Sequence, residues 1–134
     1  MNNRLKPGDS ASISRVIIKR DIEDFAQISL DRNLIHFDED FSKSTFWGKP
    51  IAHGMIGAAL ISGALTKLMG DGNIWLSANI KFEKPAFIGD KLLCVLTINS
   101  INYRGVANID VSIVKEDEEK VISGAIECMN FTCT

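Results

Sequence analysis

The sequence predicts an α+β fold, in which an antiparallel sheet carries its helices on one side. The second half of the chain is predicted to form four strands separated by turn residues. One long apolar segment rich in Gly and Ala, residues 55–69, precedes these strands and has the length of a helix. Because this helix and the strands are apolar, a sheet curved around the helix buries both. The length of 134 residues fits a single domain, residues 1–134.

The N-terminal part is expected to contain one strand and one short helix. Residues 12–17 alternate in side-chain character, as a strand does. Asp21 is predicted to be the N-cap of the helix that follows, with Asp24 at its third helical position. The helix is expected to end near Leu30.

The middle of the chain combines an irregular segment with the long helix. Residues 31–52 are predicted to be irregular, apart from a short helix near residues 38–45, and long segments of this kind are usually functional in compact domains. Residues 55–69 are apolar on every side, which predicts a helix buried all round. Gly70 is expected to stop that helix.

The rest of the chain is predicted to be sheet. The alternation of Ile109, Val111 and Ile113 with polar residues is typical of a half-buried strand. The expected strands cover residues 74–84, 91–101, 106–114 and 121–131, and the middle two form a hairpin across residues 102–105.

Composition limits the possible partners. Lys and Arg number 15 against 17 Asp and Glu, and the basic residues form no run, so nucleic acid and anionic membranes are not expected as main partners. The N-terminus lacks the apolar stretch of a signal peptide, and residues 55–69 are shorter than the roughly 20 residues that a bilayer requires. We therefore expect a cytoplasmic protein. Cys94, Cys128 and Cys133 are odd in number and lack C-x-x-C spacing, so neither disulfides nor a metal site is expected.

Candidate chemistry is concentrated between residues 31 and 55. Asp31 and His36 lie five residues apart with the polar Asn33 between them, and they can form a proton-transfer pair. The segment Pro50–Met55 then leads into the long helix. A helix N-terminus has unpaired N–H groups and a partial positive charge. Because Gly54 lacks a side chain, its N–H is open to a carbonyl oxygen that develops negative charge.

These elements resemble the R-specific enoyl-CoA hydratases, the MaoC-like dehydratases of the hot-dog fold. Residues 29–36 are similar to the family motif Ser-Gly-Asp-x-Asn-Pro-x-His, and residues 50–55 are similar to its Pro-x-x-His-Gly-Met segment. Residues 85–90 resemble its Pro-x-x-x-Gly-Asp turn. There are two departures: Leu30 replaces the usual Gly, and Leu34 replaces the usual Pro. The resemblance covers nearly the whole chain.

The resemblance implies an enzyme that adds water reversibly to a trans-2-enoyl-CoA to give an (R)-3-hydroxyacyl-CoA. It implies that Asp31 and His36 both contact the nucleophilic water; which of them is the formal base stays open. The Gly54 N–H is expected to hold the thioester oxygen. The substrate is a coenzyme A or acyl-carrier-protein thioester, and no cofactor is expected.

Other residues near this segment have weaker assignments. Asn33, Ser62 and Leu65 are predicted to bind substrate, and Asn33 is also expected to brace the loop. Ser62 either faces the pocket or bonds back to its own helix, and Leu65 is either core or a wall of the acyl pocket. His53 is expected to pack or hydrogen-bond at the helix start rather than react.

Two other functions are compatible with the fold. Hot-dog thioesterases and acyl-carrier-protein dehydratases commonly resemble one another in a carboxylate on the central helix, but residues 55–69 contain no Asp or Glu. The other alternative is a non-catalytic acyl-CoA-binding domain, inactivated by Leu30 and Leu34. A single sheet around one helix leaves an exposed edge, and the resemblance implies a homodimer with the acyl groove at its interface.

Overall fold

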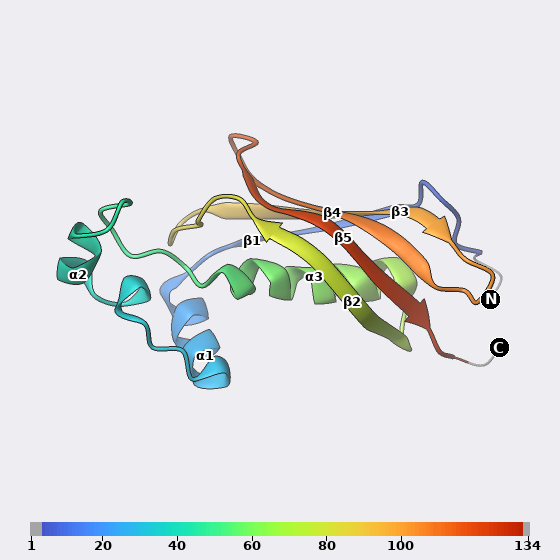
Figure 1. Cartoon of the computed structure of the whole chain (residues 1–134), viewed down its shortest axis with the longest axis horizontal. Coiled ribbons are helices and arrows are strands. Elements are labelled where there is room, and N and C mark those ends of the chain that lie inside the picture. The colour runs from blue at the N-terminus through green and yellow to red at the C-terminus, as the bar shows by residue number, and fades with distance from the viewer. Residues whose placement is uncertain (1–3, 133–134) are drawn as a thin grey trace.

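The computed structural model describes residues 4–132 and has the hot-dog architecture expected from the sequence (Figure 1). Five strands form one antiparallel sheet in the order β1-β3-β4-β5-β2. In chain order, the elements are β1 (Ser10–Val16), α1 (Lys19–Ser29), the 3-10 turn η1 (Leu34–His36), α2 (Glu39–Lys43), α3 (Gly54–Met69), β2 (Asn73–Phe82), β3 (Lys91–Ile101), β4 (Ala107–Lys115) and β5 (Lys120–Asn130).

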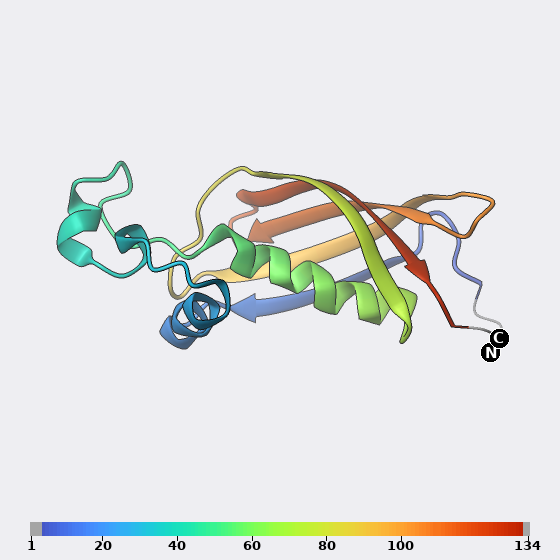
Figure 2. The ribbon, with the colours of Figure 1, turned by 60° about the horizontal axis from the view of Figure 1, so that its bottom comes forward.

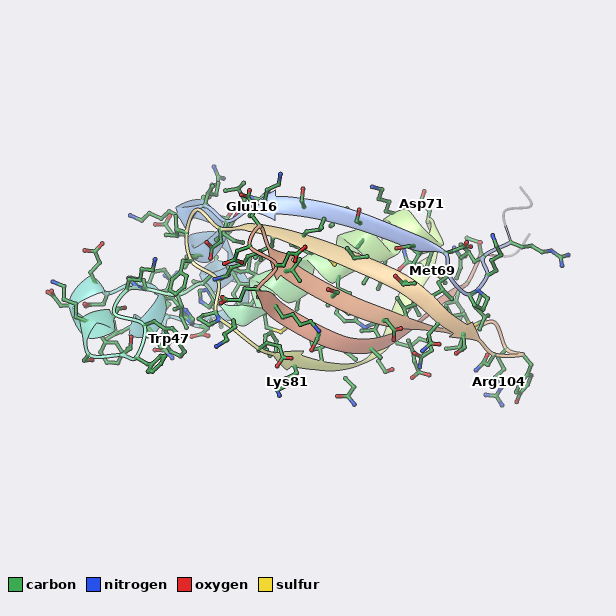
Figure 3. All side chains as sticks on the ribbon, turned by 90° about the horizontal axis from the view of Figure 1, so that it is seen from above. Trp47, Met69, Asp71, Lys81, Arg104 and Glu116 are labelled. Carbon is green, nitrogen blue, oxygen red and sulfur yellow. The ribbon has the colours of Figure 1, made fainter. Side chains whose placement is uncertain are left out.

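The helices lie on one side of the sheet. Figure 2, in which this side is turned forward, shows α3 running along the sheet, with α1 beside its first turns. The segment of residues 34–50, which includes α2, projects beyond the end of the sheet (Figure 1). Figure 3 looks onto the other side of the sheet, with Trp47 of this segment at one end of the molecule and Arg104 at the opposite end. The projecting segment begins directly after the loop that contains Asp31.

The core lies between α3 and the sheet. Ile109 and Ile113 of β4 are fully buried, as their alternation predicts. Each fully buried Ile or Leu side chain contributes about 1.5–3 kcal/mol through removal from water. The backbone of α3 approaches the sheet closely, since a Cβ added to Gly57 would lie 3.0 Å from Cδ1 of Ile122. This contact explains why the helix is rich in small residues.

The prediction that α3 is buried all round is wrong for the single chain. Ile56, Ile61 and Leu65 face the sheet and are buried, whereas Met55 and Ser62 lie on a face that is exposed. A five-stranded sheet covers only one side of a helix, so the apolar residues of the opposite face remain open to whatever else packs there.

The predicted start of α1 is also corrected. The N-cap is Ile18, and Asp21 is the third helical residue, where its carboxylate accepts a hydrogen bond from the Ile18 N–H at 3.1 Å. Asp21 also pairs with Arg15 of β1. Asp24 lies beyond the first turn, where it pairs with Arg20. An acidic residue stabilises a helix start from either position, so the sequence alone did not distinguish the two.

The cysteines within residues 4–132 lie in strands β3 and β5, and the expectation that no disulfide forms stays a prediction. Cys94 and Cys128 are free and buried, and Cys133 lies outside the described residues. Burial raises the pKa of the Cys94 thiol to about 11. No helix within residues 4–132 combines the length and the apolar character that crossing a membrane requires.

Candidate active site

The loop that carries the predicted pair begins with a left-handed residue. Leu30 caps the C-terminus of α1 at φ 62°, and its N–H donates to the Ala26 carbonyl at 2.9 Å. This turn directs the chain away from the helix axis immediately before Asp31. Glycine adopts such a φ angle freely, whereas leucine does so at a cost of about 1 kcal/mol. Leucine in place of the usual glycine at position 30 therefore lowers the stability of the folded chain slightly, but the left-handed turn still forms.

Asn33 braces the loop, as predicted. Its N–H donates to Asp31 Oδ1 at 3.0 Å, and its own Oδ1 accepts from the Ile35 N–H at 3.1 Å. The second bond caps η1, whose first residue is Leu34. Proline is well tolerated at a first helical position because the N–H there has no helical partner. Replacement of the usual Pro by Leu34 is therefore compatible with the turn, which returns His36 toward Asp31.

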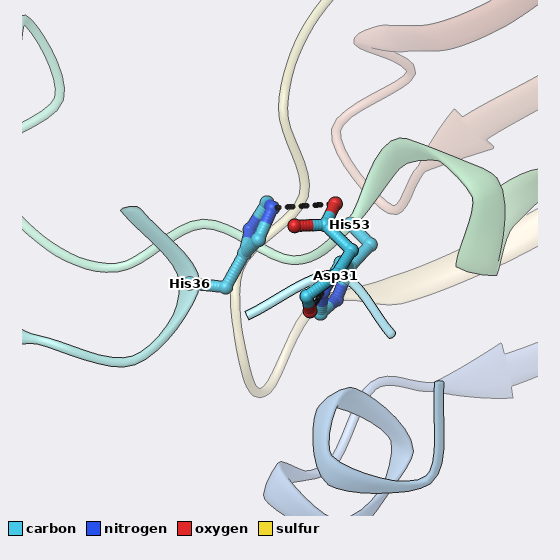
Figure 4. Close-up of side chains that lie close together, drawn as sticks. All are labelled: Asp31, His36 and His53. Carbon is cyan, nitrogen blue, oxygen red and sulfur yellow. Dashed lines mark hydrogen bonds and ion pairs between the residues drawn. The ribbon is translucent and has the colours of Figure 1, made fainter. Parts of the chain in front are cut away.

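Asp31 and His36 face each other across 4.0 Å, from Oδ2 to Nε2 (Figure 4). The Nδ1 of His36 lies 2.7 Å from the Ile51 carbonyl oxygen. Since a carbonyl only accepts, Nδ1 carries the proton and donates, and Nε2 of the neutral ring has a lone pair directed at Asp31. A water oxygen about 2.8 Å from both atoms fits this separation and would donate one hydrogen to each. The His36 side chain is largely buried, whereas that of Asp31 is half exposed.

His53, at the start of α3, contacts both Asp31 and His36 (Figure 4). It occupies the N-cap position of α3 and is 3% exposed. Its ring stacks on His36 with the centroids 3.8 Å apart, and its Nε2 lies 3.1 Å from the Asp31 carbonyl oxygen. Burial is the main cause of the lowered pKa of His53. The expectation that this residue packs and hydrogen-bonds at the helix start is confirmed.

An apolar pocket of about 460 Å³ adjoins this cluster and ends at the start of α3. His53 and Gly54 line its inner end, with Ala86 and Leu92 on the sheet side. The N–H groups of Gly54 and Met55 make no hydrogen bond within residues 4–132. Two backbone donors at the positive end of a 16-residue helix therefore border the pocket without partners of their own.

Ser62 and Leu65, both predicted to bind substrate, lie apart from this pocket. Leu65 is a fully buried core residue, and Ser62 lies on the exposed face of α3. Neither lines the pocket, so their roles in substrate binding stay predictions. Trp47 of the projecting segment does line it, whereas Phe46 beside it is 95% exposed.

Phe82 is one of the pocket residues that sequence reasoning missed. A Cβ added to Gly54 would lie 2.8 Å from Cδ1 of Phe82, so the ring packs directly on the glycine. The only sequence signal is an aromatic residue at the end of a predicted strand. Which helix residue it would meet depends on the curvature of the sheet.

Asp31, His36 and His53 also form the group best placed to ligate a metal within the described residues, with ligand atoms within 4.8 Å of one another. Two of the four imidazole nitrogens are already committed to backbone carbonyls. The expectation that the site uses no metal stays a prediction.

Fold and site together define a hot-dog protein with a facing Asp–His pair next to a helix N-terminus. Residues 3–121 match the family model described as the MaoC-like domain, and the chain belongs to that family.

Several characterised proteins are similar over most of their length. An (R)-specific enoyl-CoA hydratase of Rhodospirillum rubrum is 34% identical over 126 residues, which cover 88% of each chain. One of Aeromonas caviae is 32% identical and covers 85% of this chain and 76% of its own. The solved structure titled as the (R)-hydratase of A. caviae involved in PHA biosynthesis has a TM-score of 0.90 at 28% identity, covering 95% of this chain and 98% of that one. An unliganded R-hydratase from Pseudomonas aeruginosa has a TM-score of 0.87 at 31% identity, and the match covers 94% of this chain and 82% of that one.

Proposed function

We propose that this protein is an enoyl-CoA hydratase, a hydro-lyase that adds water reversibly to trans-2-enoyl-CoA and gives (R)-3-hydroxyacyl-CoA. The observation that carries the proposal is the Asp31–His36 pair held beside an apolar pocket that ends at uncapped N–H groups. The names of the similar proteins support the same reaction. The free, buried cysteines support the cytoplasmic location proposed for it.

The reaction requires removal of one proton from water, delivery of a proton to C2 and stabilisation of an enolate-like oxygen. Asp31 and His36 accept the two hydrogens of one water, which orients its oxygen toward C3 of the enoyl group. Protonation of either side chain stores the proton that C2 then receives. The Gly54 N–H donates to the thioester oxygen as charge develops on it, and a preaimed donor of this kind is worth about 3–4 kcal/mol.

The competing hot-dog chemistries receive less support from the residues. A thioesterase or dehydratase with its carboxylate on the central helix would need Asp or Glu in α3, which has neither. The carrier is proposed to be coenzyme A because two similar proteins are named for CoA substrates. Acyl-carrier-protein thioesters are the alternative to be compared in the same assay.

We also propose that the working form is a homodimer. Among the described strands, β2 lies at a sheet edge and pairs only with β5. Its side chains Ile74, Leu76 and Phe82 are each about half exposed, and an apolar edge of this kind favours strand pairing. A second copy placed there would also approach the open face of α3, where Ser62 lies.

Light scattering at micromolar concentration tests the assembly. The chain is expected to be a dimer, and Leu76→Lys is expected to shift it to a monomer. Ile28→Lys, at an apolar position on α1 that is more exposed than Leu76, is the control and keeps the dimer. A monomeric wild-type chain would contradict the proposal.

Loss of enoyl absorbance on addition of crotonyl-CoA tests the activity, with chiral analysis of the product. Asp31→Asn and His36→Ala are each expected to abolish hydration while the chain stays folded. Asp40→Asn makes the same chemical change at a fully exposed position of the projecting segment and should leave the rate unchanged. Near wild-type activity in either pair variant would refute the assignment, and release of free coenzyme A would favour a thioesterase.

A further inference from the structure

The residue at the N-cap of α3 does not cap the helix. Ser, Thr, Asp and Asn are preferred at this position because their side-chain oxygen accepts a hydrogen bond from the second or third helical N–H. His53 makes no such bond. Its ring is turned away from the helix toward the loop that carries Asp31 and His36.

Three contacts hold the ring in that orientation. Nε2 lies 3.1 Å from the Asp31 carbonyl oxygen, and since a carbonyl only accepts, Nε2 carries the proton and donates. One face stacks on His36, with 28° between the ring planes. The Phe25 ring of α1 packs against His53 at a centroid distance of 4.8 Å. The imidazole thus fixes both members of the pair, Asp31 through its backbone and His36 through its ring.

The proton on Nε2 leaves Nδ1 with a lone pair and no donor. Nδ1 of His53 is one of two buried side-chain polar atoms without a hydrogen-bond partner in the described chain. An unpaired buried acceptor is unfavourable and calls for an explanation. A Ser or Asp at position 53 would remove this cost by capping α3, but would engage the N–H of Met55, one of the two free backbone donors that border the pocket.

We propose that His53 is a positioning residue that sets the separation of Asp31 and His36 while it leaves the N-terminus of α3 uncapped for the substrate. This inference rests on the proposed hydratase function. His53 does not exchange protons with the substrate; it acts through the two residues that do. The unfavourable Nδ1 is the structural cost of a helix start that no side chain caps.

The surroundings keep His53 neutral. The titratable groups that contact it are Asp31 and His36, and its other neighbours are the rings of Phe25 and Phe37. Burial lowers its pKa, and the adjacent His36 opposes a second positive charge. A neutral ring keeps the single donor on Nε2 and therefore preserves the bond to the Asp31 carbonyl.

Three substitutions separate the parts of this role. His53→Phe keeps the stacking ring and removes the Nε2 donor. His53→Gln keeps an N–H donor of similar reach and removes the stacking. His53→Ser supplies a capping hydroxyl. In His53→Phe and His53→Ser we expect kcat to fall about tenfold or more, with KM changed less than about twofold. We expect His53→Gln to retain more of the wild-type kcat than these two variants.

The serine variant gives a readout that a purely structural role would not produce. His53→Ser is expected to keep or raise the thermal unfolding midpoint while kcat falls. Ile18→Ser is the matched control, because Ile18 is the N-cap of α1 and also lacks a side-chain cap bond; it should stabilise the chain without affecting hydration. Wild-type kcat in His53→Phe, or a loss of kcat that follows loss of stability in all three variants, would overturn the proposal.

Nitrogen NMR of the imidazoles tests the inference independently of catalysis. The chain contains only two histidines, so His53→Gln assigns both sets of signals. His53 is expected to be the neutral Nε2–H tautomer at about pH 7. An Nδ1–H tautomer would overturn the proposal. If the wild-type chain does not hydrate enoyl-CoA, the proposed function fails, and the tautomer still decides whether His53 holds Asp31 as inferred.

Discussion

The ring of Phe82 packs on the α-carbon of Gly54, so that a Cβ at position 54 would lie 2.8 Å from Cδ1 of Phe82. These residues belong to the end of β2 and the first turn of α3, and they meet at the pocket. The contact restricts position 54 to glycine for a reason that is separate from the oxyanion role of its N–H.

Gly54→Ala is therefore expected to destabilise the protein despite the better helix propensity of alanine. Displacement of the ring costs about 1–3 kcal/mol, against about 1 kcal/mol gained from propensity. In a Phe82→Ala background, the same substitution should become stabilising by about 1 kcal/mol. Urea unfolding of the four chains forms a double-mutant cycle. Additive effects would show that the two side chains do not interact.

Leu30→Gly should stabilise the chain. Leu30 is held at φ 62° and is 84% exposed, so its replacement relieves backbone strain and loses little packing. The expected gain in the free energy of unfolding is up to about 1 kcal/mol, once the larger entropy of glycine in the unfolded chain is subtracted. Glu118→Gly, at the other described non-glycine residue of positive φ, is the control far from the site. Destabilisation in both variants would contradict the argument.

The free energy of unfolding should decrease as the pH falls below the pKa of a free histidine, which is about 6.5. The pKa of His53 is lowered by burial, so between its folded value and about 6.5 the unfolded chain binds more protons than the folded one. The free energy of unfolding therefore has its full value above about pH 6.5 and decreases below it. His53→Phe should reduce this decrease in urea titrations from about pH 8 to 5.5. An unchanged pH dependence would mean that His53 titrates normally in the folded chain.

The Asp21 carboxylate affects stability in a separate pH range. The hydrogen-bonded Arg15 guanidinium holds the pKa of Asp21 below its usual value. That group contributes stability above about pH 4 and loses it only as the pH falls further, so it does not obscure the histidine effect.

Cys94 should resist alkylation in the folded protein. It is completely buried, and its thiol pKa of about 11 leaves almost no thiolate at neutral pH. Iodoacetamide labelling followed by peptide mass mapping should show modification of Cys94 only after denaturation. Labelling of the native chain at the rate of a free thiol would show that the sheet opens locally around β3.

The sequence was sufficient to predict the fold class and to single out Asp31 and His36 as a candidate pair. Period-two alternation identified β4, and the Gly- and Ala-rich segment identified α3, because these patterns report which side chains face a core. Asp31 and His36 were found through motif spacing, and Asn33 was expected to brace their loop. Each of these features depends on residues close together in the chain, so local sequence determines them.

Only the tertiary structure decided how distant segments meet. The stacking of His53 on His36, the carbonyl of Ile51 behind the imidazole and the ring of Phe82 on Gly54 each join residues from different elements. It also showed that one face of α3 stays open, because the number of strands that can wrap a helix is fixed by sheet curvature. Sequence determined which groups are proposed to carry the chemistry, and packing determined their separations, their hydrogen-bond partners and the helix N–H groups left free.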